Sequence, residues 1–131
     1  KISVVKEGMI ASEYGATATH DATEGGILGA VWEVAECSGV GVEIYADEIP
    51  VLDCTKKICE AAGIDYLRLV SSGTLIMTAF DGEKLVDRLK SEGINAAVIG
   101  RITDAGRYVT FNGERKELFP QEKDEIYRVD L

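Results

Sequence analysis

The sequence contains few of the residues on which several classes of protein depend. Among its 131 residues are one histidine, one tryptophan, two prolines and three cysteines. Cys54 and Cys59 lie five positions apart, and with His20 as the single imidazole they do not form a zinc pattern. An odd number of thiols in a chain of this length favours a reducing compartment, and hence the cytoplasm, over a disulfide framework.

Positive charge is scarce as well. The chain has 14 Lys and Arg against 23 Asp and Glu, for a formal net charge of −9 at pH 7. Nucleic acids and anionic membranes are bound through basic surfaces, so this balance argues against both as partners. No apolar run approaches the roughly 20 residues of a membrane span, and no signal peptide is visible at Lys1. The first residue is not methionine, which fits a piece of a longer protein.

The apolar residues are numerous enough for one core. They make up 46% of a chain that has the length of one domain. Periodicity predicts helices over 2–14, 27–38, 53–62 and 82–92, and strands over 16–19, 40–44, 75–80, 96–102 and 108–111. This alternation predicts an α/β sandwich with a mixed sheet.

Two details of the sheet follow from local patterns. Residues 75–80 are apolar on both faces, which predicts a strand in the middle of a covered sheet. Asp104-Ala105-Gly106 fits a hairpin turn, so the strands at 96–102 and 108–111 are expected to pair antiparallel.

The last twenty residues differ from the rest, because ten of residues 112–131 are charged. We expect a loosely held extension here. Its apolar residues leave a second possibility, which is docking on the body of the domain or on a partner. These residues are Leu118, Phe119, Ile126, Tyr127 and Leu131.

A polar stretch joins the predicted strand at 16–19 to the predicted helix at 27–38. It reads His-Asp-Ala-Thr-Glu-Gly-Gly over residues 20–26, called the acidic loop below. A strand, a glycine turn and a helix start can hold phosphate, because free N–H groups and the helix dipole favour an anion there. Gly25 and Gly26 would let the backbone approach the ligand closely.

The acidic residues in this loop need a further explanation. Asp21 and Glu24 would repel a bare phosphate, so they favour a magnesium ion lying between them and the phosphates. An ordinary helix start with Asp21 or Thr23 as N-cap explains the same residues, and the spacing alone favours it. The stretch matches neither a Walker loop nor a dinucleotide fingerprint.

Residues 20–30, HDATEGGILGA, resemble the C-terminal domain of the aminoimidazole ribonucleotide (AIR) synthetase superfamily. Further blocks at 32–42, 49–51, 71–75 and 97–101 are most similar to its hydrogenase-maturation branch, the carbamoyl dehydratases. The resemblance spans about residues 2–111. It implies a three-layer α/β/α sandwich at 1–111 and a family N-terminal domain that is absent from this sequence. The charged extension at 112–131 lies outside the resemblance.

The resemblance also implies a function. In this family ATP lies between two domains, and the N-terminal domain forms the dimer barrel and supplies most magnesium-binding aspartates. This chain would then help to bind ATP and Mg²⁺ in an enzyme that activates a substrate oxygen by phosphoryl transfer, and it would not turn over alone. The substrate would be a small molecule or a protein tail. The domain would contact a second copy in a homodimer, or its own N-terminal domain.

The resemblance assigns roles to particular residues. It directs Asp21 and Glu24 toward magnesium, and Thr23 with the Gly25–Gly26 backbone toward phosphate. Ser72 and Gly73, just before the predicted strand at 75–80, are further candidates for phosphate contact, and an ordinary helix-to-strand turn explains them equally well. His20 is expected to be a structural hydrogen-bonding residue.

One departure from the hydrogenase-maturation branch concerns the end of the chain. That branch ends in a cysteine that carries the substrate carbamoyl group, whereas this sequence ends in Leu131. If Leu131 is the natural end, cyanide-forming chemistry is not expected and the substrate is a different one. The alternative function is a non-catalytic interaction domain that kept the family fold.

Overall fold

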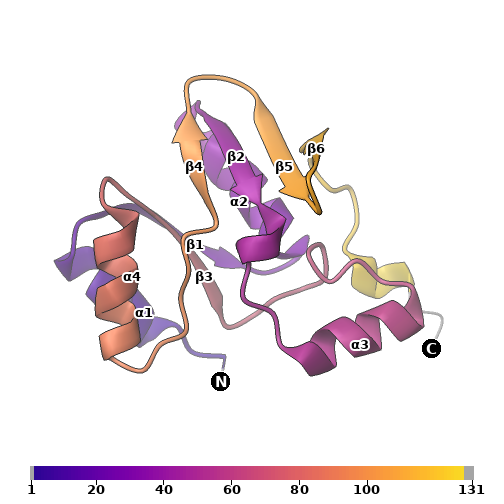
Figure 1. Cartoon of the computed structure of the whole chain (residues 1–131), viewed down its shortest axis with the longest axis horizontal. Coiled ribbons are helices and arrows are strands. Elements are labelled where there is room, and N and C mark those ends of the chain that lie inside the picture. Colours follow the sequence, from indigo (N-terminus) through magenta and orange to yellow (C-terminus); the bar gives the residue numbers. More distant parts are fainter. Residues whose placement is uncertain (1, 129–131) are drawn as a thin grey trace.

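The computed structural model describes residues 2–128, so the expectation attached to Leu131 lies outside the described residues. Helices and strands alternate as predicted (Figure 1). The elements are α1 (Val5–Glu13), β1 (Ala16–Ala22), α2 (Gly26–Ser38), β2 (Gly41–Tyr45), η1 (Ala46–Glu48), α3 (Asp53–Ala62), β3 (Thr74–Ala79), α4 (Gly82–Ser91), β4 (Gly100–Thr103), β5 (Arg107–Phe111), β6 (Glu114–Glu117) and η2 (Glu125–Arg128). Across residues 2–128, every helix is too short or too polar to cross a membrane.

The strands form two sheets. β1 and β3 pair antiparallel, with Asp21 opposite Leu75 and Ala22 opposite Thr74. The second sheet has the order β4-β2-β5-β6, in which β2 runs antiparallel to β4 and parallel to β5. The predicted α/β fold with a mixed sheet is therefore confirmed, with its strands divided between two hydrogen-bonded groups.

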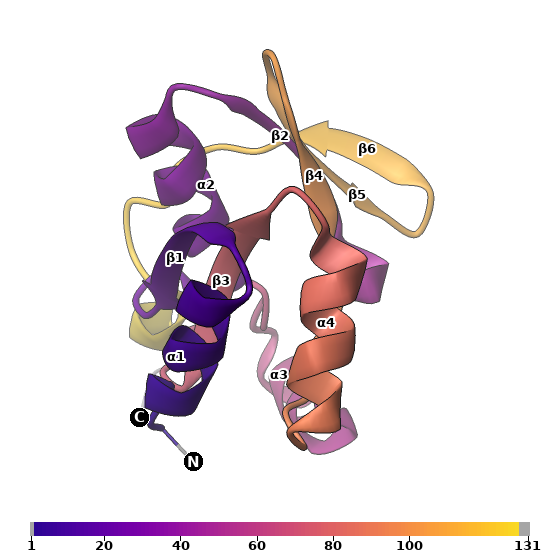
Figure 2. The same cartoon turned by 90° about the vertical axis from the view of Figure 1, so that its left-hand side faces the viewer.

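β3 is covered on both faces, which explains its continuous apolar sequence. Ile76 belongs to the main core, beside α2, and Met77 packs with α1 and α4. Successive strand residues point to opposite faces, so one strand serves both clusters. Figure 2 shows α1 and α4 standing beside β3. The prediction of a central strand is wrong in one respect, because β1 is the only strand paired with β3 among residues 2–128.

The predicted hairpin at residues 104–106 is wrong. β2 lies between β4 and β5, and the Val42 N–H donates to the Gly106 carbonyl at 2.9 Å. Gly41 permits this insertion, because a Cβ there would overlap Thr103 Oγ1 and lie 2.5 Å from the carbonyl carbon of Ala105. The pairing of β4 with β2, sixty residues earlier in the chain, therefore takes the place of the hairpin that residues 104–106 predict.

Within the described residues 112–128, the C-terminal segment is docked on the body and not loosely held. β6 pairs antiparallel with β5, although all four of its residues are charged and exposed. An edge strand needs a partner on one side only, so its charged side chains stay in water. Leu118 then enters the main core with 2% of its surface exposed.

This docking predicts different costs for two neighbouring truncations. Leu118→Ala is expected to lower the free energy of unfolding by about 3 kcal/mol, because it empties a core position. Phe119 is 59% exposed, so Phe119→Ala is expected to change the free energy of unfolding by no more than about 0.5 kcal/mol. Urea denaturation measures both, and equal stabilities would contradict the docked arrangement.

Candidate functional site

The acidic loop begins as part of a strand. β1 continues through Asp21 and Ala22, which leaves Thr23–Gly25 as the connection to α2. Ala22 points into the core with 1% of its surface exposed, whereas Asp21 on the opposite side of the strand is exposed. The side chains of Thr23 and Glu24 are also exposed.

A second predicted segment lies next to this loop. Ala22 pairs with Thr74, and the Ser71 N–H donates to the Thr23 carbonyl at 3.3 Å. Ser72 and Gly73 follow directly and are exposed. The structure therefore brings together the two segments that the sequence associates with phosphate, at one end of the β1–β3 sheet.

Three N–H groups at the start of α2, those of Gly25, Gly26 and Leu28, have partners within the chain. The Gly25 N–H donates to Asp124 Oδ2 at 2.6 Å, and the Leu28 N–H donates to the Leu67 carbonyl at 3.1 Å. The expectation of free N–H groups at this helix start is therefore not met at Gly25, Gly26 and Leu28. A carboxylate of the C-terminal segment lies where the sequence predicts an anion.

The two glycines of the loop have different environments. Both have left-handed backbones, with φ of +79° at Gly25 and +64° at Gly26. A Cβ on Gly25 would meet only the Cα of Gly29, at 3.5 Å, whereas a Cβ on Gly26 would lie 2.6 Å from the Leu67 carbonyl oxygen. Gly26 is therefore required for the packing of α2, whereas a Cβ atom on Gly25 would overlap no neighbouring atom.

The predicted metal ligands supply only part of a coordination sphere. Within residues 2–128, no group of three or more His, Cys, Asp or Glu side chains is arranged to hold a metal ion. Asp21 and Glu24 are exposed, so each offers a carboxylate oxygen to the surface. Magnesium commonly takes one or two carboxylates and completes its octahedron with phosphate oxygens and water, so these two residues fit that role.

His20 and Arg101 have structural partners. His20 Nε2 lies 2.7 Å from Glu33 Oε2, which links β1 to α2 and agrees with the predicted structural role. Arg101 Nη2 donates to Glu43 Oε2 at 3.0 Å, and this hydrogen bond raises the pKa of the guanidinium.

Burial raises the pKa of Tyr66, which packs against the main core.

An acidic hollow of about 350 Å³ opens between α2 and the C-terminal segment. The charged residues that line it are four acidic ones and one basic one: Glu24, Glu33, Glu122, Asp124 and Lys123. An anionic ligand would meet a negative potential here, which favours entry together with a cation. Sequence reasoning missed Asp124, because nothing distinguishes it from its charged neighbours.

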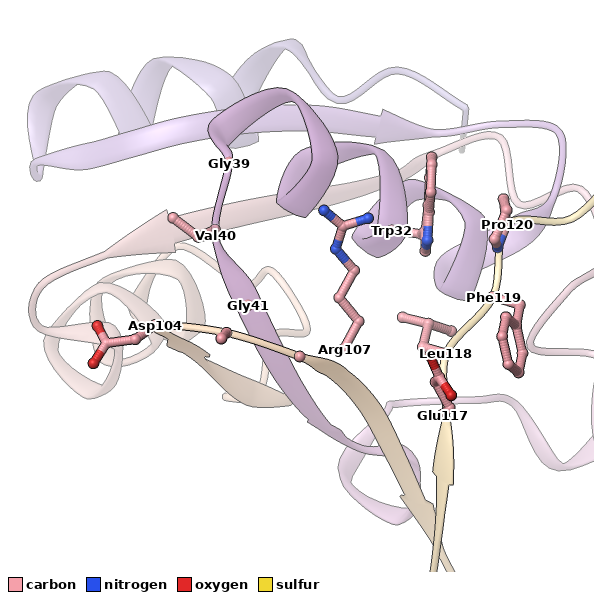
Figure 3. A pocket seen from close by; sticks show the side chains of 12 residues that line it. Trp32, Gly39, Val40, Gly41, Asp104, Arg107, Glu117, Leu118, Phe119 and Pro120 are labelled. Atoms are coloured by element: carbon pink, nitrogen blue, oxygen red, sulfur yellow. The ribbon is translucent and has the colours of Figure 1, made fainter.

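A second hollow, of about 480 Å³, lies further along α2 and is bounded by residues 117–120 (Figure 3). Arg107 points into it, and its guanidinium carbon lies 5.0 Å from the centre of the Trp32 ring. Arg107 Nη1 also pairs with Glu36 Oε2 at 2.5 Å. The arginine is therefore already neutralised, and it ties β5 to α2.

Comparison with known proteins relates this fold to a family. Residues 1–111 match the family described as AIR synthase related protein, C-terminal domain. The carbamoyl dehydratase HypE of Escherichia coli is 32% identical over 94 residues, which are 69% of this chain and 28% of HypE. The chain spans less than a third of the length of the curated relatives it matches.

Solved structures show the same likeness. The crystal structure of E. coli HypE, a hydrogenase maturation protein, has a TM-score of 0.81 and 26% identity, and the match covers 95% of this chain and 42% of that one. The crystal structure of a HypE–HypF complex has a TM-score of 0.73 and 28% sequence identity, and the match covers 84% of this chain and 38% of that one. The crystal structure of HypE in complex with ATP has a TM-score of 0.74 and 23% sequence identity, and the match covers 82% of this chain and 36% of that one. At this identity the likeness shows the fold alone.

The glycine environments predict unequal costs of substitution. Gly26→Ala is expected to lower the free energy of unfolding by about 3 kcal/mol, because a strained backbone is combined with overlap on a carbonyl oxygen. Gly25→Ala is expected to cost about 1 kcal/mol, from the backbone alone. Urea denaturation of the two variants checks this, and equal losses would show that Gly26 has no special packing role.

Proposed function

This chain belongs to the family of AIR synthase related proteins, as a C-terminal domain like that of the HypE hydrogenase-maturation proteins, and we propose that it forms one wall of an ATP site. The family domain comprises residues 1–111, and residues 112–131 form its C-terminal segment. The second wall comes from an N-terminal domain in a longer protein. That protein uses ATP to activate a substrate oxygen by phosphoryl transfer.

The observation that carries the proposal is the meeting of two exposed polar segments at one end of the β1–β3 sheet. The connection at Thr23–Gly25 and the turn at 71–73 are joined by the bond from the Ser71 N–H to the Thr23 carbonyl. Thr23 and Ser72 are exposed, whereas the Ser71 hydroxyl donates to the Leu69 carbonyl at 2.8 Å. An open surface of this kind fits half of a site that is completed by another domain.

The roles of the residues follow from what phosphoryl transfer requires. When bound, magnesium supplies charge neutralisation between the phosphates. Asp21 and Glu24 each offer a carboxylate oxygen toward that ion, while Thr23 and Ser72 offer hydroxyl donors to phosphate oxygens. The family resemblance assigns most of the magnesium-binding aspartates to the N-terminal domain, so turnover requires that domain as well.

A second candidate function is a non-catalytic interaction domain. α3 buries only Cys59, while Leu52 and Ile58 are 70% and 67% exposed. These side chains favour contact with a further protein surface. The N-terminal domain of the same chain and a separate partner both fit this surface, so the size of the natural protein distinguishes the two functions.

The first test removes both predicted magnesium ligands from the natural full-length protein. Asp21→Asn with Glu24→Gln is expected to weaken Mg²⁺-ATP binding by about tenfold or more, because both anionic ligands are lost. Isothermal titration calorimetry measures the dissociation constant. Glu83→Gln with Asp87→Asn removes the same charge from exposed positions of α4 and is the control. Unchanged affinity in the first variant would exclude Asp21 and Glu24 from the site.

The second test measures the intact mass of the natural protein, detected by an antibody against this domain. A mass well above 14.1 kDa is expected, because the relatives are more than three times as long as the matched region. A mass near that of this chain would remove the second wall of the proposed ATP site. The interaction function would then be preferred, and partner capture would replace enzyme assays.

A further inference from the structure

A groove runs along α2, between this helix and the C-terminal segment. The acidic hollow forms one end of it, beside Gly25, and the hollow shown in Figure 3 forms the other end, beside Gly39. Trp32 and Pro120 line both hollows, so the two adjoin and together form one groove, the α2 groove. A helix of thirteen residues is about 20 Å long, which matches about six residues of extended chain.

The walls of the α2 groove carry mostly negative charge. Six of the eight charged residues that line it are acidic. Four of these acidic residues are exposed and take part in no ion pair among residues 2–128: Glu24, Asp104, Glu117 and Glu122. A cationic ligand would therefore be attracted along the whole length of the groove.

Aromatic side chains lie among these carboxylates. Trp32 lies where the two hollows meet, Phe119 lines one hollow and Tyr127 lines the other. Phe119 and Tyr127 are 59% and 67% exposed, so two rings on the C-terminal wall stay largely uncovered by residues 2–128. Proteins bind guanidinium and ammonium groups between aromatic faces and carboxylates, through cation–π attraction and charge-assisted hydrogen bonds.

One arginine of the chain is already held in this way. The guanidinium carbon of Arg107 lies 5.0 Å from the centre of the Trp32 ring, and the same group pairs with Glu36 of α2. Figure 3 shows the Arg107 side chain pointing into the hollow beside Trp32. The groove therefore holds one guanidinium from within the chain, and its remaining carboxylates and rings offer the same chemistry to an external one.

We propose that the α2 groove is a docking site for an extended basic segment of a partner protein, with arginine or lysine side chains spaced along it. The carboxylates extend from Asp104 at one end of the groove to Glu24 at the other, so a single small cation would contact only some of them. Nucleic acids and anionic membranes would be repelled by the same charges. A second copy of this chain also carries a net charge of −9 and is disfavoured.

The geometry of an extended chain defines a suitable probe. Alternate side chains of such a chain point to the same side, so a basic residue at every second position directs its cations toward one surface. The probe is a fluorescein-labelled hexapeptide of alternating arginine and alanine, which matches the length of the groove. It contains no phosphate and no aromatic residue, so charge and cation–π contacts dominate its binding.

The experiment measures binding of this peptide to the natural full-length protein by fluorescence anisotropy. Saturable binding is expected, with a dissociation constant that rises as salt is added, because the attraction is between charges. Glu117→Gln with Glu122→Gln removes two exposed carboxylates from the C-terminal wall and is expected to weaken binding about threefold to tenfold. Glu13→Gln with Glu83→Gln removes the same charge from exposed positions of α1 and α4, which pack on the face of β3 opposite to α2. This control is expected to leave the dissociation constant unchanged.

Each further outcome counts against the docking site. Absence of saturable binding overturns it, and so does equal weakening by the two double variants, because general attraction to an acidic protein would then explain the affinity. L-argininamide carries one guanidinium group and is expected to bind at least about tenfold more weakly than the peptide. Equal affinity of the two would overturn the assignment to an extended segment. Neither double variant changes Asp21 or Glu24, so these outcomes are independent of the proposed ATP site.

Discussion

Burial of α2 between two sheets is the interaction on which the rest of this structure depends. The helix buries seven of its thirteen residues, among them Ile27, Leu28 and Val31. Ala22 and Ile76 from the β1–β3 sheet and Val42 and Ile44 from the second sheet complete the same cluster. Among residues 2–128 no strand pairing joins the two sheets, so apolar packing on α2 holds them together.

The position of α2 also determines the geometry of the candidate site. Gly26 packs against the turn at residues 67–69, so the start of the helix is held by backbone contacts on one side. The other side is held by Asp124, which comes from the opposite end of the sequence. The loop between β1 and α2 therefore depends on two segments that are distant from it in sequence, and one of them is the C-terminal segment.

The elements that sequence patterns predicted well are those with local causes. α2 was expected at 27–38 and is observed at 26–38, because its apolar stripe and the glycine that follows it define both ends. The closeness of residues 23–26 and 71–73 agrees with the family resemblance, although no single stretch predicts it. Their functional roles stay predictions.

The elements that were missed depend on contacts distant in sequence. The insertion of β2 between β4 and β5 requires Gly41 to lie under the turn at 104–106, and a lone glycine before a strand does not reveal this. Asp124 is 99 residues from its partner Gly25 and sits in a run of charged residues. Local periodicity carries no information about such a pair.

The composition of β6 has a consequence for how this molecule meets its neighbours. Its outer edge is unpaired among the described residues, and its sequence is Glu-Arg-Lys-Glu. A strand added from another chain would have to accommodate charges on both faces at every position, at a cost in desolvation. Extension of the sheet at this edge is therefore disfavoured, so β6 limits fibril-like stacking on its side of the sheet.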